Sequence, residues 1–397
     1  MKRLRNIGLL VAAWVLLLTV IWMRPLPPLS VPANVFPPPA PLSGAAVFYN
    51  QAFAAIPSVS SEEWKCLYAK GDEPLDRNYS RQIIERFGPV FDLLAQGANE
   101  PGCAWGLDLN QKETFLHLSK VARCTRALIL RARLRLDDGN SAGAADDLLM
   151  GMRLNRQAGE PSLYPSTLNR ISCESLLLPV AAANLPRFDA AALQKLADGI
   201  AAFPPAHSLA DCIPVEKRRL PLAVYARVSE LRDCVAKGPW YAPIAVKVGS
   251  IVTQAPSLEI YRATPEALAA WTRAMEPNYD ALERILRLPF SERESHMDAL
   301  LSAARAGTNP LADCVFPFSL SACRKEIQTE AMWTIFRTAL EARLHGTADL
   351  RARIAALPDP FDATPLKCRD VKAGVEIQLQ GAPSQPPVMF TVGLDWK

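Results

Sequence analysis

The chain has 397 residues, of which 50% are apolar and 21% charged; this composition is ordinary for a globular protein and excludes a wholly disordered chain. Its net charge of +4 equals the contribution of Lys2, Arg3, Arg5 and Arg24, because residues 1–24 contain no acid. The rest of the chain is neutral, so we expect no nucleic acid as a partner, since such affinity rests largely on phosphate neutralisation.

Residues 7–23 form an uncharged apolar segment, IGLLVAAWVLLLTVIWM. This length is at the short end of what spans a bilayer, and the basic residues before it favour a cytoplasmic N-terminus. The alternative is a cleaved signal peptide, but the one tolerable cleavage site, Val31-Pro32-Ala33, lies well beyond the apolar segment. We therefore expect an uncleaved single-pass anchor over 1–24 in the inner (cytoplasmic) membrane, with the body periplasmic.

The next segment contains eight prolines between residues 25 and 41. Proline fixes φ and removes an amide donor, so this segment cannot form a helix or a central strand. We expect an extended, semi-rigid spacer over 25–44 that separates the body from the membrane.

Nine cysteines are scattered along the chain, and no two have the Cys-x-x-Cys spacing of thioredoxin-like and zinc-ribbon proteins. Beyond a membrane anchor, scattered cysteines are typical of disulfides in an oxidising compartment. The candidates are Cys66, Cys103, Cys212, Cys234, Cys314 and Cys323, with Cys212–Cys234 and Cys314–Cys323 as the local pairs. We expect Cys368 to be unpaired. The alternative is that several cysteines are small buried apolar residues.

Apolar residues recur with a helical period through most of the body. The expected helices span 81–97, 115–136, 141–156, 166–183, 208–236, 264–287, 291–305 and 322–344, with a further helix between Asp189, a good N-cap, and Phe203. Pro89 is expected to kink the first helix or to mark its true start. Ser291 and Glu294 have capping-box spacing. Segments 238–262 and 307–320 are expected to be loops.

Strand patterns occur only near the end of the sequence, at 375–379 and 388–392, and predict a β-hairpin. The expected fold is therefore mainly α, with a body of helical hairpins similar to tetratricopeptide or other α-solenoid units and a small β-hairpin. We divide the body into a helical domain over 45–237, a second helical region over 238–357, and a β-containing segment over 358–397.

The sequence LRLDDGNSAGAA at 134–145 resembles the turn of a tetratricopeptide unit, with Gly at the turn and small residues where helices pack closely. Further motifs are WGLDL (105–109), EPSL (160–163), LNRI (168–171), LPRFD (185–189), FPP (203–205) and EKR (216–218). Together they resemble an uncharacterised family of bacterial membrane-anchored proteins of Planctomycetes-type genomes. The resemblance implies an architecture and a location, and no molecular activity.

The C-terminal motifs PDPFD (358–362), PLK (365–367) and FTVGLD (390–395) resemble an ending found in that family and in some pseudopilin-like proteins of type II secretion systems. That ending reads Gly-Pro-Asp where this chain has Gly-Leu-Asp. The segment 7–23 also lacks the acid that the pseudopilin signature requires. We therefore do not expect a pilin subunit.

No familiar catalytic, metal or cofactor motif is present. The sequence contains no His-Glu-x-x-His, no Gly-x-Ser-x-Gly and no Gly-rich phosphate loop, so we expect no metal or cofactor. The one candidate interaction face consists of Arg123, Arg126 and Arg133 with His117, because arginine forks suit carboxylates and phosphates. The alternative is that these arginines pair with Asp146, Asp147 and Glu174 on neighbouring helices.

Three functions remain open. The first is an anchored extracytoplasmic interaction or scaffold module with an envelope protein as its partner. The second is an accessory subunit of a secretion or pilus-like machine, suggested by the C-terminal motifs. The third is an envelope hydrolase, which would require converging His, Asp or Glu side chains in a pocket.

Overall fold

The computed structural model describes residues 26, 29, 35–68, 76–110, 115–159, 163–237, 257–312, 320–346, 350–361, 363–372, 374–379 and 388–393. The chain divides into two compact units. The larger unit consists of residues 38–216, 282–298 and 318–397, and the smaller unit of residues 1–37, 217–281 and 299–317.

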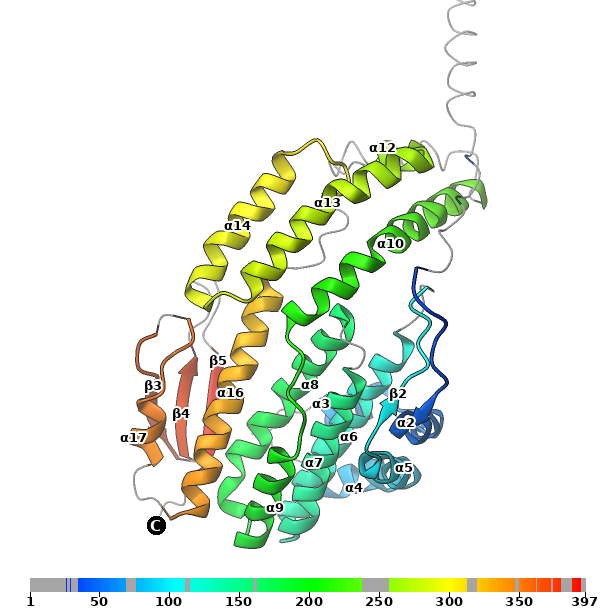
Figure 1. The fold of residues 1–397 in the computed structure, drawn as a ribbon. Helices are drawn as coiled ribbons and strands as arrows, with labels where there is room; N and C mark the ends of the chain where they lie inside the picture. Colours follow the sequence, from blue (N-terminus) through cyan, green and yellow to red (C-terminus); the bar gives the residue numbers. More distant parts are fainter. Residues whose placement is uncertain are drawn as a thin grey trace, which may run out of the picture. The chain divides into compact units, whose positions relative to one another are not determined.

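The described chain is mainly α-helical, as expected, with a small sheet near its C-terminus (Figure 1). The helices of the larger unit are α2 (Ala45–Ala54), α3 (Ser61–Tyr68), α4 (Arg77–Arg86), α5 (Gly88–Asn99), α6 (Leu116–Asp137), α7 (Ser141–Ala158), α8 (Tyr164–Ala183), α9 (Ala190–Ala201), α16 (Leu320–Leu344) and α17 (Leu350–Ala355), with the 3-10 turn η1 (Leu185–Arg187). Helix α12 (Ser257–Arg262) lies in the smaller unit, and α10 (Leu209–Lys237), α13 (Pro265–Leu286) and α14 (Phe290–Ala306) each have residues in both.

Local sequence signals explain most of the helix boundaries. Helix α5 begins at Gly88 with Pro89 in its first turn, a position where the missing amide is tolerated, so Pro89 starts a helix and does not kink one. Helices α6 and α7 form a hairpin whose turn has Gly139 at φ 76°. The Asn140 side chain then caps α7 by accepting from the Gly143 amide at 2.9 Å.

Two further expectations about helix starts have opposite outcomes. Asp189 caps α9, since its Oδ1 accepts from the Ala192 amide at 2.8 Å. The capping box of Ser291 and Glu294 is wrong, because α14 already begins at Phe290 and Glu294 forms an ion pair with Arg324. Residues 257–262, expected in a loop, form α12.

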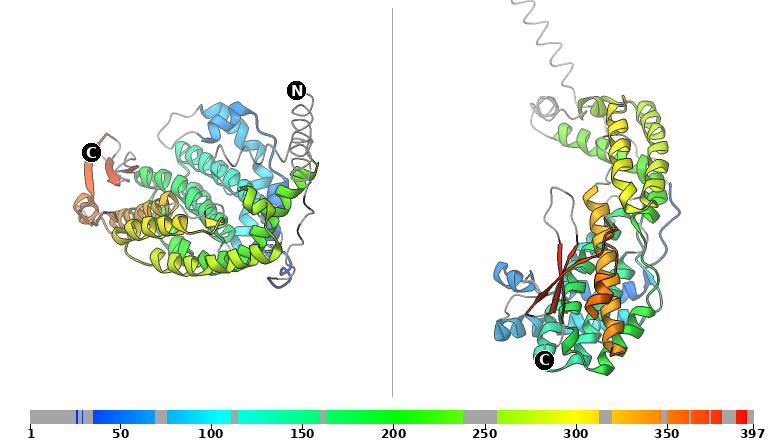
Figure 2. Two further views of the ribbon diagram at one scale, coloured as in Figure 1. Left: turned by 90° about the horizontal axis from the view of Figure 1, so that it is seen from above. Right: turned by 90° about the vertical axis from the view of Figure 1, so that its left-hand side faces the viewer.

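The sheet has three antiparallel strands in the order β3 (Lys367–Val371), β4 (Gly374–Leu379) and β5 (Val388–Gly393). The expected hairpin is β4–β5, with Val375 opposite Val392; β3 was not expected. Buried residues of β4 and β5 share one core with α7, α8, α9 and α16, and the sheet lies beside α16 in Figures 1 and 2.

A second core of the larger unit lies among α2, α4, α5 and α6. At its centre Tyr49 is fully buried and donates to Oε1 of Gln157. Gly97 of α5 allows the Tyr49 ring to approach, because a Cβ at Gly97 would lie 2.5 Å from Cε1 of that ring. The two-residue strands β1 (Ser43–Gly44) and β2 (Cys103–Ala104) pair beside this core.

The end of the expected spacer is fixed to the folded chain. Both Nε and Nη2 of Arg218 on α10 donate to the carbonyl of Val35, the latter at 2.7 Å. The guanidinium also lies 4.7 Å from the centre of the buried Phe36 ring. Within 25–44, residues 35–36 and 43–44 therefore belong to the packed structure and are not a free tether.

The expected anchor, residues 7–23, lies outside the described residues. Among the residues that the structure does describe, no helix combines the length and apolarity needed to cross a membrane.

The two compact units do not follow the domain ranges that we had expected from the sequence. Helix α16, from the expected second region, packs against α8 and α9 of the first. Strand β5, from the expected C-terminal segment, packs against α8. The larger unit is thus assembled from separate stretches of chain.

Candidate functional site

The arginine row of α6 faces aromatic residues of α3. The guanidinium of Arg123 lies 5.1 Å from the centre of the Trp64 ring, and that of Arg126 lies 4.0 Å from the centre of the Tyr68 ring. Such cation–π contacts contribute about 0.5–1 kcal/mol at exposed sites. Short helix α3 thus packs over part of the face on which we expected a ligand.

The other two members of the expected face are buried. Arg133 is 8% exposed and His117 is 9% exposed, and the His117 ring stacks on Trp105 with ring centres 4.5 Å apart. The structure therefore does not bring Arg123, Arg126, Arg133 and His117 to one accessible surface.

The acids expected to pair with this row have other partners. Asp147 is fully buried and accepts two hydrogen bonds at 3.0 Å from Nε of Arg131. It also lies 3.0 Å from Nη1 of Arg135. Asp146 pairs with Lys195 at 2.5 Å. The sequence therefore assigns these two acids to the wrong basic residues, since α6 carries arginines on several sides.

The expected disulfides are not observed among the described cysteines. Cys66, Cys103, Cys124, Cys173, Cys212, Cys323 and Cys368 are all free, while Cys234 and Cys314 lie outside the residues whose side chains are described. Burial raises the pKa of the Cys212 thiol to about 12 and that of Cys323 to about 11. The alternative reading, small buried apolar residues, describes Cys124, Cys173, Cys212 and Cys323.

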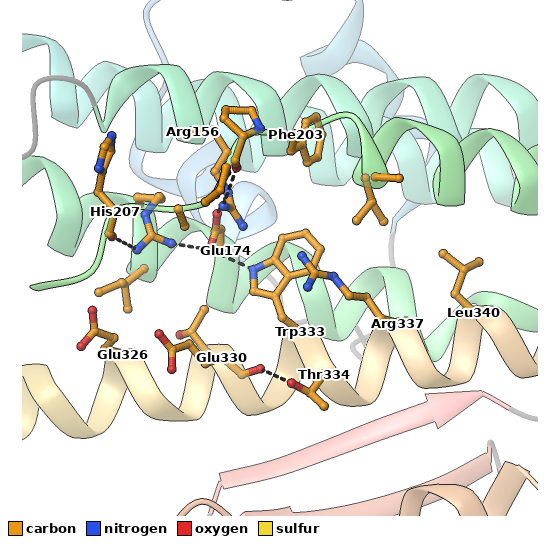
Figure 3. Close-up of a pocket in the computed structure, with 18 of the residues that line it drawn as sticks. Arg156, Glu174, Phe203, His207, Glu326, Glu330, Trp333, Thr334, Arg337 and Leu340 are labelled. Atoms are coloured by element: carbon orange, nitrogen blue, oxygen red, sulfur yellow. Dashed lines mark hydrogen bonds and ion pairs between the residues drawn. The ribbon is translucent and has the colours of Figure 1, made fainter. Parts of the chain in front are cut away.

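A cleft with a volume of about 690 Å³ lies within the larger unit (Figure 3). Helix α16 forms one wall. Residues of α7 and α8, the end of α9 and the extended segment 203–207 form the other. Volumes of 300–1,000 Å³ are typical of ligand pockets, so this cleft is the candidate functional site.

The wall opposite α16 is held together by a buried carboxylate, Glu174. Its Oε1 lies 2.7 Å from Nε of Arg156, and its Oε2 accepts from Arg170 at 2.8 Å. Both arginines also donate to carbonyls of the extended segment: Arg170 to His207 at 2.8 Å and Arg156 to Pro204 at 3.4 Å. One ion-pair cluster thus fixes the position of the segment at the rim of the cleft.

Trp333 of α16 connects the two walls. Its Nε1 donates to Oε2 of Glu174 at 2.9 Å, and the guanidinium groups of Arg156 and Arg337 lie 5.4 Å and 5.2 Å from its ring centre. The residue is 5% exposed. Trp333 is therefore structural, and its faces are not open platforms for a ligand.

The α16 wall presents a row of charged residues to the cleft. Glu326, Glu330 and Arg337 line it and project from α16 on the same side in Figure 3. Spacings of four and seven residues place side chains on one helical face. From Glu326 to Arg337 the row changes from acidic to basic. Glu341, which also lines the cleft, follows Arg337 by one turn and pairs with Arg353 at 3.7 Å.

Glu326 lies at the buried end of the row and is 3% exposed. Its Oε1 accepts from the Leu209 amide at 2.6 Å, while its Oε2 is 3.8 Å from Nη1 of Arg293. The pKa of Glu326 is raised to about 7, mainly by burial and also by the nearby Glu330, against the opposing effects of the Leu209 amide, Arg293 and Arg170. Such a carboxyl exchanges its proton near neutral pH.

Glu330 and Arg337 are the members of this row without an ion pair in the described structure, although the positive charges of Arg293 and Arg170 act on Glu330. Among the described residues, no hydrogen bond or ion pair reaches the Glu330 carboxylate, and no carboxylate pairs with the Arg337 guanidinium. Both residues are exposed. Loss of hydration within the cleft nonetheless raises the pKa of Glu330. A ligand with complementary charges would satisfy both groups at once.

Sequence reasoning missed this site. The row Glu326, Glu330 and Arg337 is visible as an i, i+4, i+11 pattern, but solvated charged faces of helices look the same. The row differs from such a solvated face because residues 156–207 form a second wall opposite it. Within the described chain, no group of three or more His, Cys, Asp or Glu could hold a metal ion.

Compared with family models, with curated proteins and with solved structures, the chain shows no match. The function therefore has to be argued from the cleft.

Proposed function

We propose that this protein is a membrane-anchored binding module of the cell envelope and that the cleft along α16 receives a segment of its partner. The helical-hairpin body, similar in style to tetratricopeptide units, would present the cleft outside the cytoplasm. Residues 7–23 would supply the anchor. The proline-rich residues before Val35 would connect it to the body, to which the Leu26 amide is bound by a 3.2 Å hydrogen bond to the Tyr261 hydroxyl.

The observation that carries this proposal is the pair of unpartnered opposite charges, Glu330 and Arg337, at the surface of a cleft of about 690 Å³. Elsewhere on these helices ionic side chains find partners: Glu174, Asp147 and Asp146 are all paired. A binding surface needs such groups to remain free until the partner arrives.

The location rests on the sequence of residues 1–24 alone. The free thiols of the seven described cysteines remove disulfides as an argument for an oxidising compartment. Positive charge before an apolar segment remains the reason to place the body outside the cytoplasm. Labelling of intact cells with a membrane-impermeant reagent, at cysteines introduced at Ser119 and Glu62, tests this orientation directly.

Site-specific photo-crosslinking in living cells tests the binding module. A photoreactive residue at Thr334, which is exposed and lines the cleft, should capture one defined partner. The same residue at Ser119, exposed on α6, is the matched control. The Arg337→Glu exchange should abolish capture at Thr334. Equal capture at both positions, or capture unaffected by that exchange, would contradict the proposal.

A second candidate, an envelope hydrolase, is favoured by Glu326, because a carboxyl with a pKa of about 7 is suited to general acid catalysis. Against it, Glu326 and Glu330 lie one turn apart on the same helix, whereas acid–nucleophile pairs flank a scissile bond from opposite sides. The imidazole of His207 points away from both (Figure 3). Release of soluble fragments from purified cell wall by the wild type, and not by Glu326→Gln, would support this candidate.

A further inference from the structure

The charges of the α16 row define the kind of segment that the cleft accepts. At 1.5 Å rise per residue, the seven positions from Glu330 to Arg337 correspond to about 10 Å along the helix axis. Seven positions are close to two full turns, so both side chains lie on the same face of α16. This axial spacing of the two positions sets the order of the distance between the positive and the negative group that a ligand must carry.

An extended peptide has this dimension. Each residue advances the chain by about 3.3–3.6 Å, so three residues separate an amino group from a carboxylate by roughly 10 Å. The cleft, at about 690 Å³, has the size of a pocket for a ligand of that kind. The extended segment 203–207 forms the rim of the opposite wall, across the cleft from α16.

The two ends of the row differ in chemistry. Glu330 has Glu326 one turn away and forms no ion pair within the described residues, although Arg293 and Arg170 offset part of its negative charge. We therefore expect this end to attract positive charge. The Arg337 guanidinium lies 5.2 Å from the centre of the Trp333 ring, and no carboxylate of the described residues pairs with it, so its donors are available to a carboxylate. Arg156 and Arg170 are both bound to Glu174, whose single negative charge balances one of the two guanidinium groups.

Resting on the function proposed above, we propose that the cleft binds an extended peptide whose positive group lies against Glu330 and Glu326 and whose carboxylate lies against Arg337. The peptide runs along α16 with its positive end toward the start of the helix. Trp333 does not contact it as a stacking surface and serves to hold Arg337 in place.

Calorimetric titration of the detergent-solubilised full chain tests this assignment. The probes are trialanine, its N-acetylated form, its C-terminal amide and the doubly blocked peptide. Each blocking group removes one charge and is expected to weaken binding about tenfold, the equivalent of one lost charge-assisted contact. Equal binding of all four peptides, or no binding of trialanine at millimolar concentration, would overturn the assignment.

Variants identify which residue of the cleft binds which charged group of the peptide. Glu330→Gln should weaken trialanine and leave the N-acetylated form unchanged, and Arg337→Gln should weaken trialanine and leave the amide unchanged. Glu62→Gln and Arg273→Gln, at exposed positions outside the cleft, are the matched controls and should bind as the wild type does. Loss of binding that does not follow this pairing would refute the orientation.

The end-capped peptide N-acetyl-Lys-Ala-Asp-amide carries the same charges on side chains. Tighter binding of this probe would identify an internal segment of a protein as the natural occupant, and tighter binding of trialanine a free peptide. If a photoreactive residue at position 334 captures a partner in cells while none of these peptides binds, the peptide proposal is wrong and the proposal of a binding module is supported. If neither result is obtained, both fail.

Discussion

The indole Nε1 of Trp333 donates a 2.9 Å hydrogen bond to Oε2 of Glu174, a residue 159 positions earlier in the chain. This bond joins α16 to α8, and through Glu174 it joins α16 to Arg156 and Arg170. The two walls of the cleft are therefore held at a fixed separation by one buried carboxylate.

Replacing Glu174 by Ala should destabilise the protein by about 3–5 kcal/mol, because two buried guanidinium groups lose their counter-ion. Chemical denaturation monitored by circular dichroism measures this loss. Asp146→Ala is the control: its ion pair with Lys195 is about half exposed, at 48% and 46%, and its removal should cost at most about 1 kcal/mol. Similar losses in both variants would show that the Glu174 cluster is not structural.

Glu326→Gln should stabilise the protein relative to wild type, and increasingly so as the pH rises. Burial raises the pKa of Glu326 from 4.5 to about 7, so in this range the folded state holds a proton that the unfolded state has lost. The difference should be absent below pH 4.5, should grow between 4.5 and 7, and should reach about 3 kcal/mol above that. Unfolding midpoints across this range provide the measurement, and a difference that does not vary with pH would refute the shift.

Gly97→Ala should destabilise the larger unit by about 1–3 kcal/mol through overpacking. Its Cβ would lie 2.5 Å from the Tyr49 ring, and that ring is fully buried and cannot swing aside. Gly88→Ala in the same helix is the control, since no atom lies within 4 Å of its Cβ, and it should be neutral or slightly stabilising. The thermal unfolding midpoints of the two variants measure this difference, and equal midpoints would contradict the close packing of Gly97 against Tyr49.

Alkylation of the unreduced, denatured protein should modify all seven described cysteines, because each is a free thiol. In the native protein Cys124 and Cys173 should react far more slowly than Cys66. Both are buried, and burial raises the pKa of Cys124 to about 12 and that of Cys173 to about 11. Mass spectrometry of the modified peptides distinguishes them. Protection of Cys212 or Cys323 that only a reductant removes would restore the disulfides that the sequence suggested.

The sequence predicted the long helices well because their apolar periodicity persists over many turns. The limits of α6, α10 and α13 lie within one residue of the expected ones. Short elements were missed where the pattern is too brief to read: α3 has eight residues and β3 only five.

The candidate site could not be predicted, for a different physical reason. Which arginine meets which acid depends on the rotation of packed helices, and a change of one position redirects a side chain by about 100°. Arg123 and Arg131 thus have different environments, one on Trp64 and one on Asp147. The cleft also needs α16 beside α8, a long-range pairing without a local signal.

The larger unit takes its parts from three stretches of chain, and β5 packs against α8 about two hundred residues earlier. Deleting residues 358–397 should therefore unfold the helices and not merely trim them. During synthesis the part of α8 that β5 contacts, near Ala183, stays uncovered until the strand ending at Gly393 is made. We expect this interval to be the period in which the chain most needs a chaperone.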